Sequence, residues 1–284
     1  MKRWPALDLS LPRPGEAAGA WQDLLAAALD DLQPTAIQEA DDRWRVFFAS
    51  AGARDRAART LSDGLPGITV AGVVDVDDED WARRSQETLG PVRVGRVVVT
   101  PPWSAGRITG DTLLEVVILP SMGFGTGHHA STRLCTALLQ QLDLSGRSVL
   151  DVGTGSGVLA LVALRLGAAS IVGVDDDADA VAAAADNLDL NGAADRITLR
   201  CADFRSLSSA SADVVTANLT GTLLVRTAAL LASAVGPAGS LIVSGVTAEE
   251  EGEVVHAFSP HLVVAGRLAE DGWVGLRFER RSNV

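Results

Sequence analysis

The chain has 284 residues, of which 47% are hydrophobic and 21% charged, and its formal net charge is −12 at pH 7. This composition is typical of a folded globular protein of one or two domains and excludes a chain that is disordered throughout. The acidic balance argues against electrostatic capture of nucleic acid, and no apolar run approaches the ~20 residues of a membrane span.

Several residue types that carry chemistry are scarce. Lys2 is the only lysine and there is no tyrosine, which argues against lysine Schiff-base chemistry, P-loop chemistry and a tyrosine general acid. The two cysteines, Cys135 and Cys201, fit no disulfide or metal-binding pattern, so a reducing cytoplasm is the expected location.

The first 75 residues predict a small α+β domain. Strands are expected at 4–9, 35–40, 43–49 and 68–76. Helices are expected at 53–65 and at 17–32, where apolar residues recur with the spacing of one helical face. The order β-α-β-β-α-β is that of a ferredoxin-like domain.

A run of mostly acidic residues at 75–80 follows the predicted α+β domain. It indicates a solvated linker that leads into a short helix at 81–89, because a metal-binding loop of the EF-hand kind would need a glycine at its turn. Strands at 92–100 and 112–119 are expected to pair. We therefore predict that residues 76–118 form a linker and a β-hairpin.

From residue 119 to residue 284 the chain alternates strands and helices. Short strands are expected at 148–152, 170–175, 197–201, 214–218 and 240–244. This alternation predicts an α/β fold with a doubly wound parallel sheet covered by helices on both faces. Two further strands, at 261–268 and 273–280, are separated by a short turn and predict an antiparallel edge.

The strongest local signal is the sequence LDVGTGSG at 150–157, where a buried strand runs into a glycine-rich turn. Glycine is needed where the backbone approaches a ligand or takes a positive φ. A dinucleotide-binding turn would need G-x-G-x-x-G, but the residue three positions after Gly155 is Val158. The pattern that starts at Gly153 instead resembles the S-adenosylmethionine turn of Rossmann-like methyltransferases.

Acidic residues follow the next two strands. Asp175 ends the strand at 170–175, where a carboxylate can accept hydrogen bonds from both hydroxyls of a ribose. The alternative is that Asp175 caps the next helix. Asp203, just past the strand at 197–201, can accept from an adenine amino group, and a plain surface turn is an equal alternative there.

A glycine-rich segment, MGFGTGHHASTR at 122–133, precedes an apolar helix. Three glycines within five residues predict a loop that packs tightly against another group. A glycine-rich turn that ends in a Ser/Thr helix cap is the alternative. The adjacent His128 and His129 make a poor metal site, because neighbouring side chains seldom chelate one ion.

Asn218 lies at the end of the fourth strand of the predicted parallel sheet. In this architecture that strand end lies beside the reactive group of the ligand, and an amide there can accept a hydrogen bond from an amine. A structural amide that caps the following helix is the alternative.

The motifs MGFGTGHHASTRL, LDVGTGSG, VGVD and ANL, in this order, resemble those of the PrmA-type methyltransferases that modify ribosomal large-subunit protein eleven. The resemblance covers nearly the whole chain. It implies a small N-terminal substrate-recognition domain, a linker and a cytoplasmic enzyme that transfers a methyl group from S-adenosylmethionine, without a metal, to amino groups of that protein. It implies that the methyl donor is bound by Thr132, Gly153, Asp175 and Asn218.

We extend the expected donor site to Phe124, Thr126, Gly155 and Asp203, and expect Asn218 and His128 to orient the amine.

The sequence departs from the family pattern at Ala130-Ser131 and after Asn218. The alternatives are a methyltransferase for another protein or a small molecule, a nucleotide-dependent oxidoreductase, which Val158 disfavours, and a non-catalytic S-adenosylmethionine-binding module.

Overall fold

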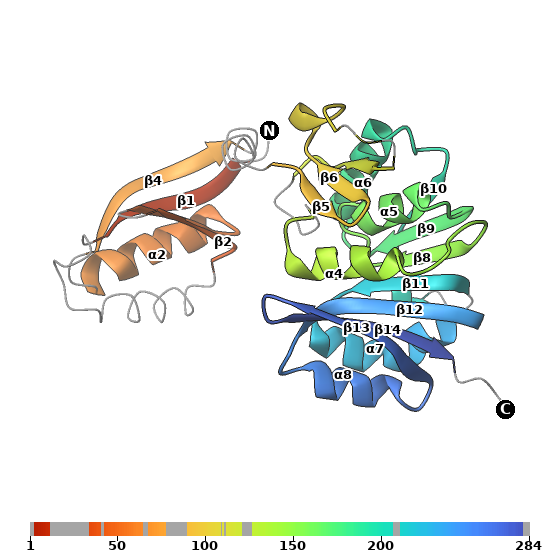
Figure 1. Cartoon of the computed structure of the whole chain (residues 1–284). Coiled ribbons are helices and arrows are strands. Elements are labelled where there is room, and N and C mark those ends of the chain that lie inside the picture. Colours follow the sequence, from red (N-terminus) through yellow and green to blue (C-terminus); the bar gives the residue numbers. More distant parts are fainter. Residues whose placement is uncertain are drawn as a thin grey trace. The chain divides into compact units, whose positions relative to one another are not determined.

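The computed structural model describes residues 3–11, 34–40, 43–64, 68–77, 90–108, 110, 112–120, 127–206 and 211–280. The chain forms two compact units, residues 1–88 and 89–284 (Figure 1). The first unit has one sheet and one hydrophobic core cluster, and the second unit has two sheets and two core clusters.

The first unit contains an antiparallel sheet with the order β2-β3-β1-β4. Its strands are β1 (Arg3–Ser10), β2 (Ala36–Ala40), β3 (Arg43–Phe47) and β4 (Thr69–Asp77). Helix α2 (Ala51–Gly64) packs Ala57 and Leu61 into one core with Leu7 of β1. These strands and this helix were predicted from the sequence, whereas the helix expected at 17–32 lies outside the described residues.

A three-stranded sheet opens the second unit. Strands β5 (Val92–Val94) and β6 (Val97–Thr100) are antiparallel, and β7 (Leu114–Val117) is parallel to β6. The predicted pairing of 92–100 with 112–119 is present between β6 and β7, but it is parallel, so these two segments do not form the predicted hairpin. The chain turns back early at Gly95, whose φ is +58°, and the connection after β6 then returns β7 in the parallel direction. The predicted boundary after residue 118 lies inside this compact unit.

The main sheet of the second unit has seven strands in the order β10-β9-β8-β11-β12-β14-β13. Its strands are β8 (Ser148–Val152), β9 (Ser170–Asp175), β10 (Ile197–Cys201), β11 (Ala212–Asn218), β12 (Val235–Thr247), β13 (Leu262–Glu270) and β14 (Trp273–Arg280). The first five in the sheet order are parallel, and β14 is antiparallel to both of its neighbours. This confirms the doubly wound sheet with an antiparallel edge.

Helices cover both faces of this sheet (Figure 1). They are α4 (Ala130–Leu139), α5 (Val158–Arg165), α6 (Ala178–Leu190), α7 (Gly221–Ala234) and α8 (Glu251–Phe258). Side chains alternate along the strands, so Val149 joins one core with α4, α5 and α6, and Leu150 joins the other with α7 and α8. Within the described ranges, no helix has the length and apolar character needed to cross a membrane.

Candidate functional site

Three of the predicted motifs meet at one edge of the seven-stranded sheet. Strand β8 pairs in parallel with β9 on one side and with β11 on the other. The glycine turn at 153–157, Asp175 and Asn218 therefore follow the carboxyl ends of adjacent strands. In doubly wound sheets this edge is where ligands bind.

The glycine turn needs glycine for its own geometry. Gly153, Gly155 and Gly157 have φ angles of +69°, +53° and +78°, in the left-handed region that side chains disfavour. A Cβ atom on Gly153 would lie 2.5 Å from Cδ2 of Leu219. The positive φ angles predicted for this turn are thus confirmed, and the backbone at Gly153 is closely covered on one side.

Asp175 is hydrogen-bonded to the glycine turn. Its Oδ2 accepts from the backbone N–H of Gly155 at 2.8 Å, and its Oδ1 accepts from the N–H of Asp177 at 3.1 Å. A carboxylate has about four acceptor positions, so two remain for hydroxyls of a ligand. Asp177 is the residue that caps α6, by accepting from the N–H of Asp179 at 2.9 Å.

A buried carboxylate, Asp151, lies one residue before the end of β8. Asp151 is only 1% exposed, and its two oxygens accept from the hydroxyls of Thr154 at 2.7 Å and Thr216 at 2.6 Å. Burial raises the pKa of the Asp151 carboxyl, while the two hydroxyl bonds act in the opposite direction. The sequence did not predict these two threonine partners. The one available signal was that a threonine lies near the end of β8 and another near the end of β11.

The amide of Asn218 contacts the start of α4. Its Nδ2 donates to Oγ1 of Thr132 at 3.4 Å, and Thr132 is 2% exposed. With Nδ2 used in this way, Oδ1 of Asn218 is the atom suited to accept from an amine. The N-cap of α7 is Thr220, so the helix-capping alternative for Asn218 does not hold.

The two histidines of the glycine-rich segment have structural partners. His129 is the N-cap of α4, where its Nδ1 accepts from the N–H of Ser131, so the expected Ser/Thr cap is replaced by a histidine. The His129 ring packs edge-on against Trp273, with 4.6 Å between the ring centroids. His128 donates from Nε2 to the carbonyl oxygen of Gly90 at 3.1 Å. Among the described residues, no group of three or more His, Cys, Asp or Glu side chains could hold a metal.

Arg133 joins the start of α4 to the turn between β13 and β14. Its guanidinium donates to the carbonyl oxygen of His128, to Glu270 at 2.9 Å and to Asp271 at 3.1 Å. The acidic partners lie 137 and 138 positions away in the chain, so no local sequence signal indicated this contact.

The remaining predicted residues have different outcomes. Phe124 and Thr126 lie outside the described residues. Asp203 accepts from the guanidinium of Arg205, with both carboxylate oxygens in use, and this contact holds the pKa of Asp203 below its usual range. Both side chains of this ion pair are substantially exposed, so the pair adds little stability. The backbone N–H of Ala202 bonds to the carbonyl of Asp175 at 2.8 Å, which places the start of this turn beside β9.

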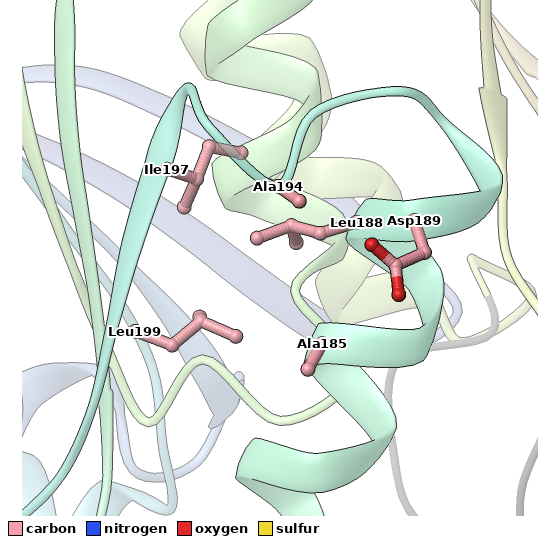
Figure 2. A pocket seen from close by; sticks show the side chains of 6 residues that line it. All are labelled: Ala185, Leu188, Asp189, Ala194, Ile197 and Leu199. Carbon is pink, nitrogen blue, oxygen red and sulfur yellow. The ribbon is translucent and has the colours of Figure 1, made fainter.

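A pocket of about 220 Å³ lies between α6 and β10 (Figure 2). Its lining residues are Ala185, Leu188, Asp189, Ala194, Ile197 and Leu199. None of them was predicted to bind the donor. Ile197 opens β10, whereas the predicted donor residues follow the carboxyl ends of the strands. This pocket is therefore separate from the site built around Asp175 and Asn218.

Comparisons with known proteins agree with these features. Residues 34–281 match the family described as ribosomal protein L11 methyltransferase (PrmA). The ribosomal protein L11 methyltransferase of Cupriavidus metallidurans is 38% identical over 226 residues, which are 79% of this chain and 71% of the relative. That of Geobacter metallireducens is 42% identical over 211 residues, 73% of this chain and 68% of the relative.

A solved structure supports the fold. The ribosomal protein L11 methylase of Lactobacillus delbrueckii subsp. bulgaricus matches with a TM-score of 0.63 and 24% identity, over 68% of this chain and 98% of that one. The family match and the two relatives confirm the sequence resemblance, and the chain belongs to the ribosomal protein L11 methyltransferase (PrmA) family.

Proposed function

We propose that this protein transfers methyl groups from S-adenosylmethionine to amino groups of ribosomal protein L11. Family membership over residues 34–281 and relatives that carry this activity in their names support the assignment. The structural observation that carries it is the meeting of the glycine turn, Asp175 and the Thr132–Asn218 pair at one edge of the sheet.

The residues at this edge fit the donor. The glycine turn, held at positive φ, carries no side chain at Gly153, Gly155 or Gly157 that would keep a ligand from its backbone. The two acceptor positions left on Asp175 suit the ribose hydroxyls. We propose that Thr132, Gly153, Gly155 and Asn218 contact the donor as well, that Asp203 accepts from the adenine amino group, and that Phe124 and Thr126 complete the site.

The chemistry needs alignment more than activation. When bound, S-adenosylmethionine supplies a methyl carbon whose bond to sulfur breaks, with the electron pair passing to sulfur, as the bond to the amine nitrogen forms. A lysine acceptor must first lose a proton, which costs about 4.6 kcal/mol at pH 7 from a reference pKa of ~10.4. Desolvation of the amine lowers that pKa and offsets much of the cost.

Asn218 is the residue we assign to the amine. Its Nδ2 is held by the Thr132 hydroxyl, so its Oδ1 can accept from the amine and direct the nitrogen lone pair. We propose that the amine loses its proton to water before the site closes, and that His128 helps to orient the acceptor.

We also propose that residues 1–75 form a ferredoxin-like recognition domain for the protein substrate. The sheet order β2-β3-β1-β4, with every neighbouring pair antiparallel, supports this topology.

Incubation of the purified protein with labelled S-adenosylmethionine and ribosomal protein L11 tests the proposal. We expect the label on amino groups of that protein, located by mass spectrometry. Calorimetry should show binding of S-adenosylmethionine and S-adenosylhomocysteine but not of NAD. NAD binding without affinity for either adenosyl compound would refute the donor assignment, and labelling of another protein in a cell extract would identify a different acceptor.

A further inference from the structure

The outer edge of β7 is completed by side chains instead of a strand. The N–H of Leu114 bonds to the carbonyl of Arg96, just before β6, and the N–H of Ile118 bonds to the carbonyl of Thr100 in β6. The intervening odd-numbered residues of β7 therefore direct their backbone groups away from β6. Three side chains bond there: Arg165 to the carbonyl of Glu115 (2.9 Å), Asn191 to both backbone groups of Val117 (2.9 and 2.6 Å), and Asn187 to the N–H of Leu119 (2.8 Å).

Asn187 differs from the other two because it also reaches the glycine turn. Its Oδ1 accepts from Leu119, and its Nδ2 donates to the carbonyl oxygen of Ser156 at 2.9 Å. The Asn187 side chain is 1% exposed, so water cannot replace either bond without a rearrangement. A single buried amide is therefore shared between the end of β7 and the turn at 153–157.

One of the two bonded segments, the glycine turn, belongs to the candidate donor site. Ser156 precedes Gly157, where an added Cβ would already contact Ala184 of α6 at 3.4 Å, so the turn lies closely on this helix. The amide of Asn187 thus sets the separation between the glycine turn and the end of β7.

We propose that Asn187 is a positioning residue for donor binding, which acts by fixing the glycine turn relative to the end of β7. The inference rests on the proposed function, because that function assigns the turn to the methyl donor. Asn191 provides a matched control, because it has the same side chain and lies one helical turn further along. Its amide bonds to Val117 of β7 and to the carbonyl of Asn187, and not to the glycine turn.

The test compares Asn187→Ala, Asn187→Asp and Asn191→Ala. The aspartate variant keeps an acceptor for Leu119 but loses the N–H donor to Ser156. Calorimetry with S-adenosylhomocysteine and thermal melting of the ligand-free proteins are measured for each. We expect all three to melt below wild type, with the dissociation constant raised about tenfold in both Asn187 variants and unchanged in Asn191→Ala.

The outcomes separate this inference from the proposed function. Wild-type protein that does not bind S-adenosylhomocysteine would overturn the proposed function and this inference with it. Wild-type binding together with wild-type affinity in both Asn187 variants would overturn the inference alone. An equal loss of affinity for S-adenosylhomocysteine in Asn191→Ala would assign the loss to general destabilisation and overturn the inference. The same conclusion would follow if both Asn187 variants failed to fold while Asn191→Ala folded.

Discussion

The amide of Asn218 donates to the hydroxyl of Thr132 across 3.4 Å, although 86 positions separate the two residues in the chain. One residue ends a central parallel strand and the other lies in the first turn of α4. The bond joins the first and the last of the four sequence motifs, and it leaves the Oδ1 end of the Asn218 amide available to a nucleophile.

Replacing Asn218 by alanine should therefore reduce turnover more than donor affinity. Loss of the acceptor that aligns the amine should lower the single-turnover methylation rate by about tenfold or more. Thr132→Ser, which keeps a hydroxyl for Nδ2, serves as the control and should retain most of the rate. Rapid-quench rates of Asn218→Ala that equal wild type would remove this residue from the mechanism.

Asp175→Ala should weaken binding of the donor and of its demethylated product by ~1.5–3 kcal/mol, because charge-assisted hydrogen bonds to the ribose are lost. Calorimetry with S-adenosylhomocysteine measures this. Asp186→Ala removes the same charge from an exposed position on α6 and should leave the dissociation constant unchanged. A folded Asp175→Ala protein with wild-type affinity would reject the ribose assignment.

Asp151 should make the protein less stable as the pH rises. The pKa of this buried carboxyl is raised by burial, whereas an unfolded aspartate titrates near pH ~3.9. Between the two pKa values the folded state holds a proton that the unfolded state has lost. The contribution of Asp151 is therefore fully present below about pH 4 and is lost as the pH rises through the folded pKa.

Urea unfolding of Asp151→Asn and wild type across this pH range measures the effect. The stability of the variant relative to wild type should rise with pH and then level off, since asparagine does not ionise. Asp213→Asn should show the opposite sign, because hydrogen bonds from Ser148 lower the pKa of Asp213 and its contribution is lost as the pH falls. A pH-independent difference for Asp151→Asn would contradict the raised pKa.

Removing residues 1–88, the first compact unit, should separate donor binding from substrate recognition. All donor motifs lie after residue 120, so affinity for S-adenosylhomocysteine should be retained. Methylation of ribosomal protein L11 should fall by about a hundredfold, because the substrate is no longer held near the site. A truncated protein that methylates the ribosomal protein at the full rate would disprove the recognition role.

Strands β8, β9 and β10 were predictable because each is a short run rich in β-branched residues between turn residues. Strands β8, β9, β10 and β14 have the predicted bounds. The parallel order of β9, β8 and β11 then places Asp175 and Asn218 beside the glycine turn. Local pattern and topology were sufficient for this part of the candidate site.

Other features depend on contacts that local sequence does not encode. Apolar runs do not reveal whether a neighbouring strand is parallel, so the pairing of β6 with β7 was predicted but its parallel direction was not. Histidine is not a preferred N-cap residue, which hid the role of His129. Asn187 bonds to Leu119 across 68 positions, and only its spacing of four from Asn191 hinted at a shared face.

The position of β14 has a consequence for the order in which this enzyme is built. This strand follows β13 in the chain, yet it lies between β12 and β13 in the sheet, and its first residue, Trp273, packs on His129 at the start of α4. A nascent chain that has not reached Trp273 already contains all four donor motifs but lacks this support for the helix that carries Thr132. Competence to bind the methyl donor should therefore arise only after Trp273 has been made, so shorter nascent chains would not compete with the folded enzyme for the donor.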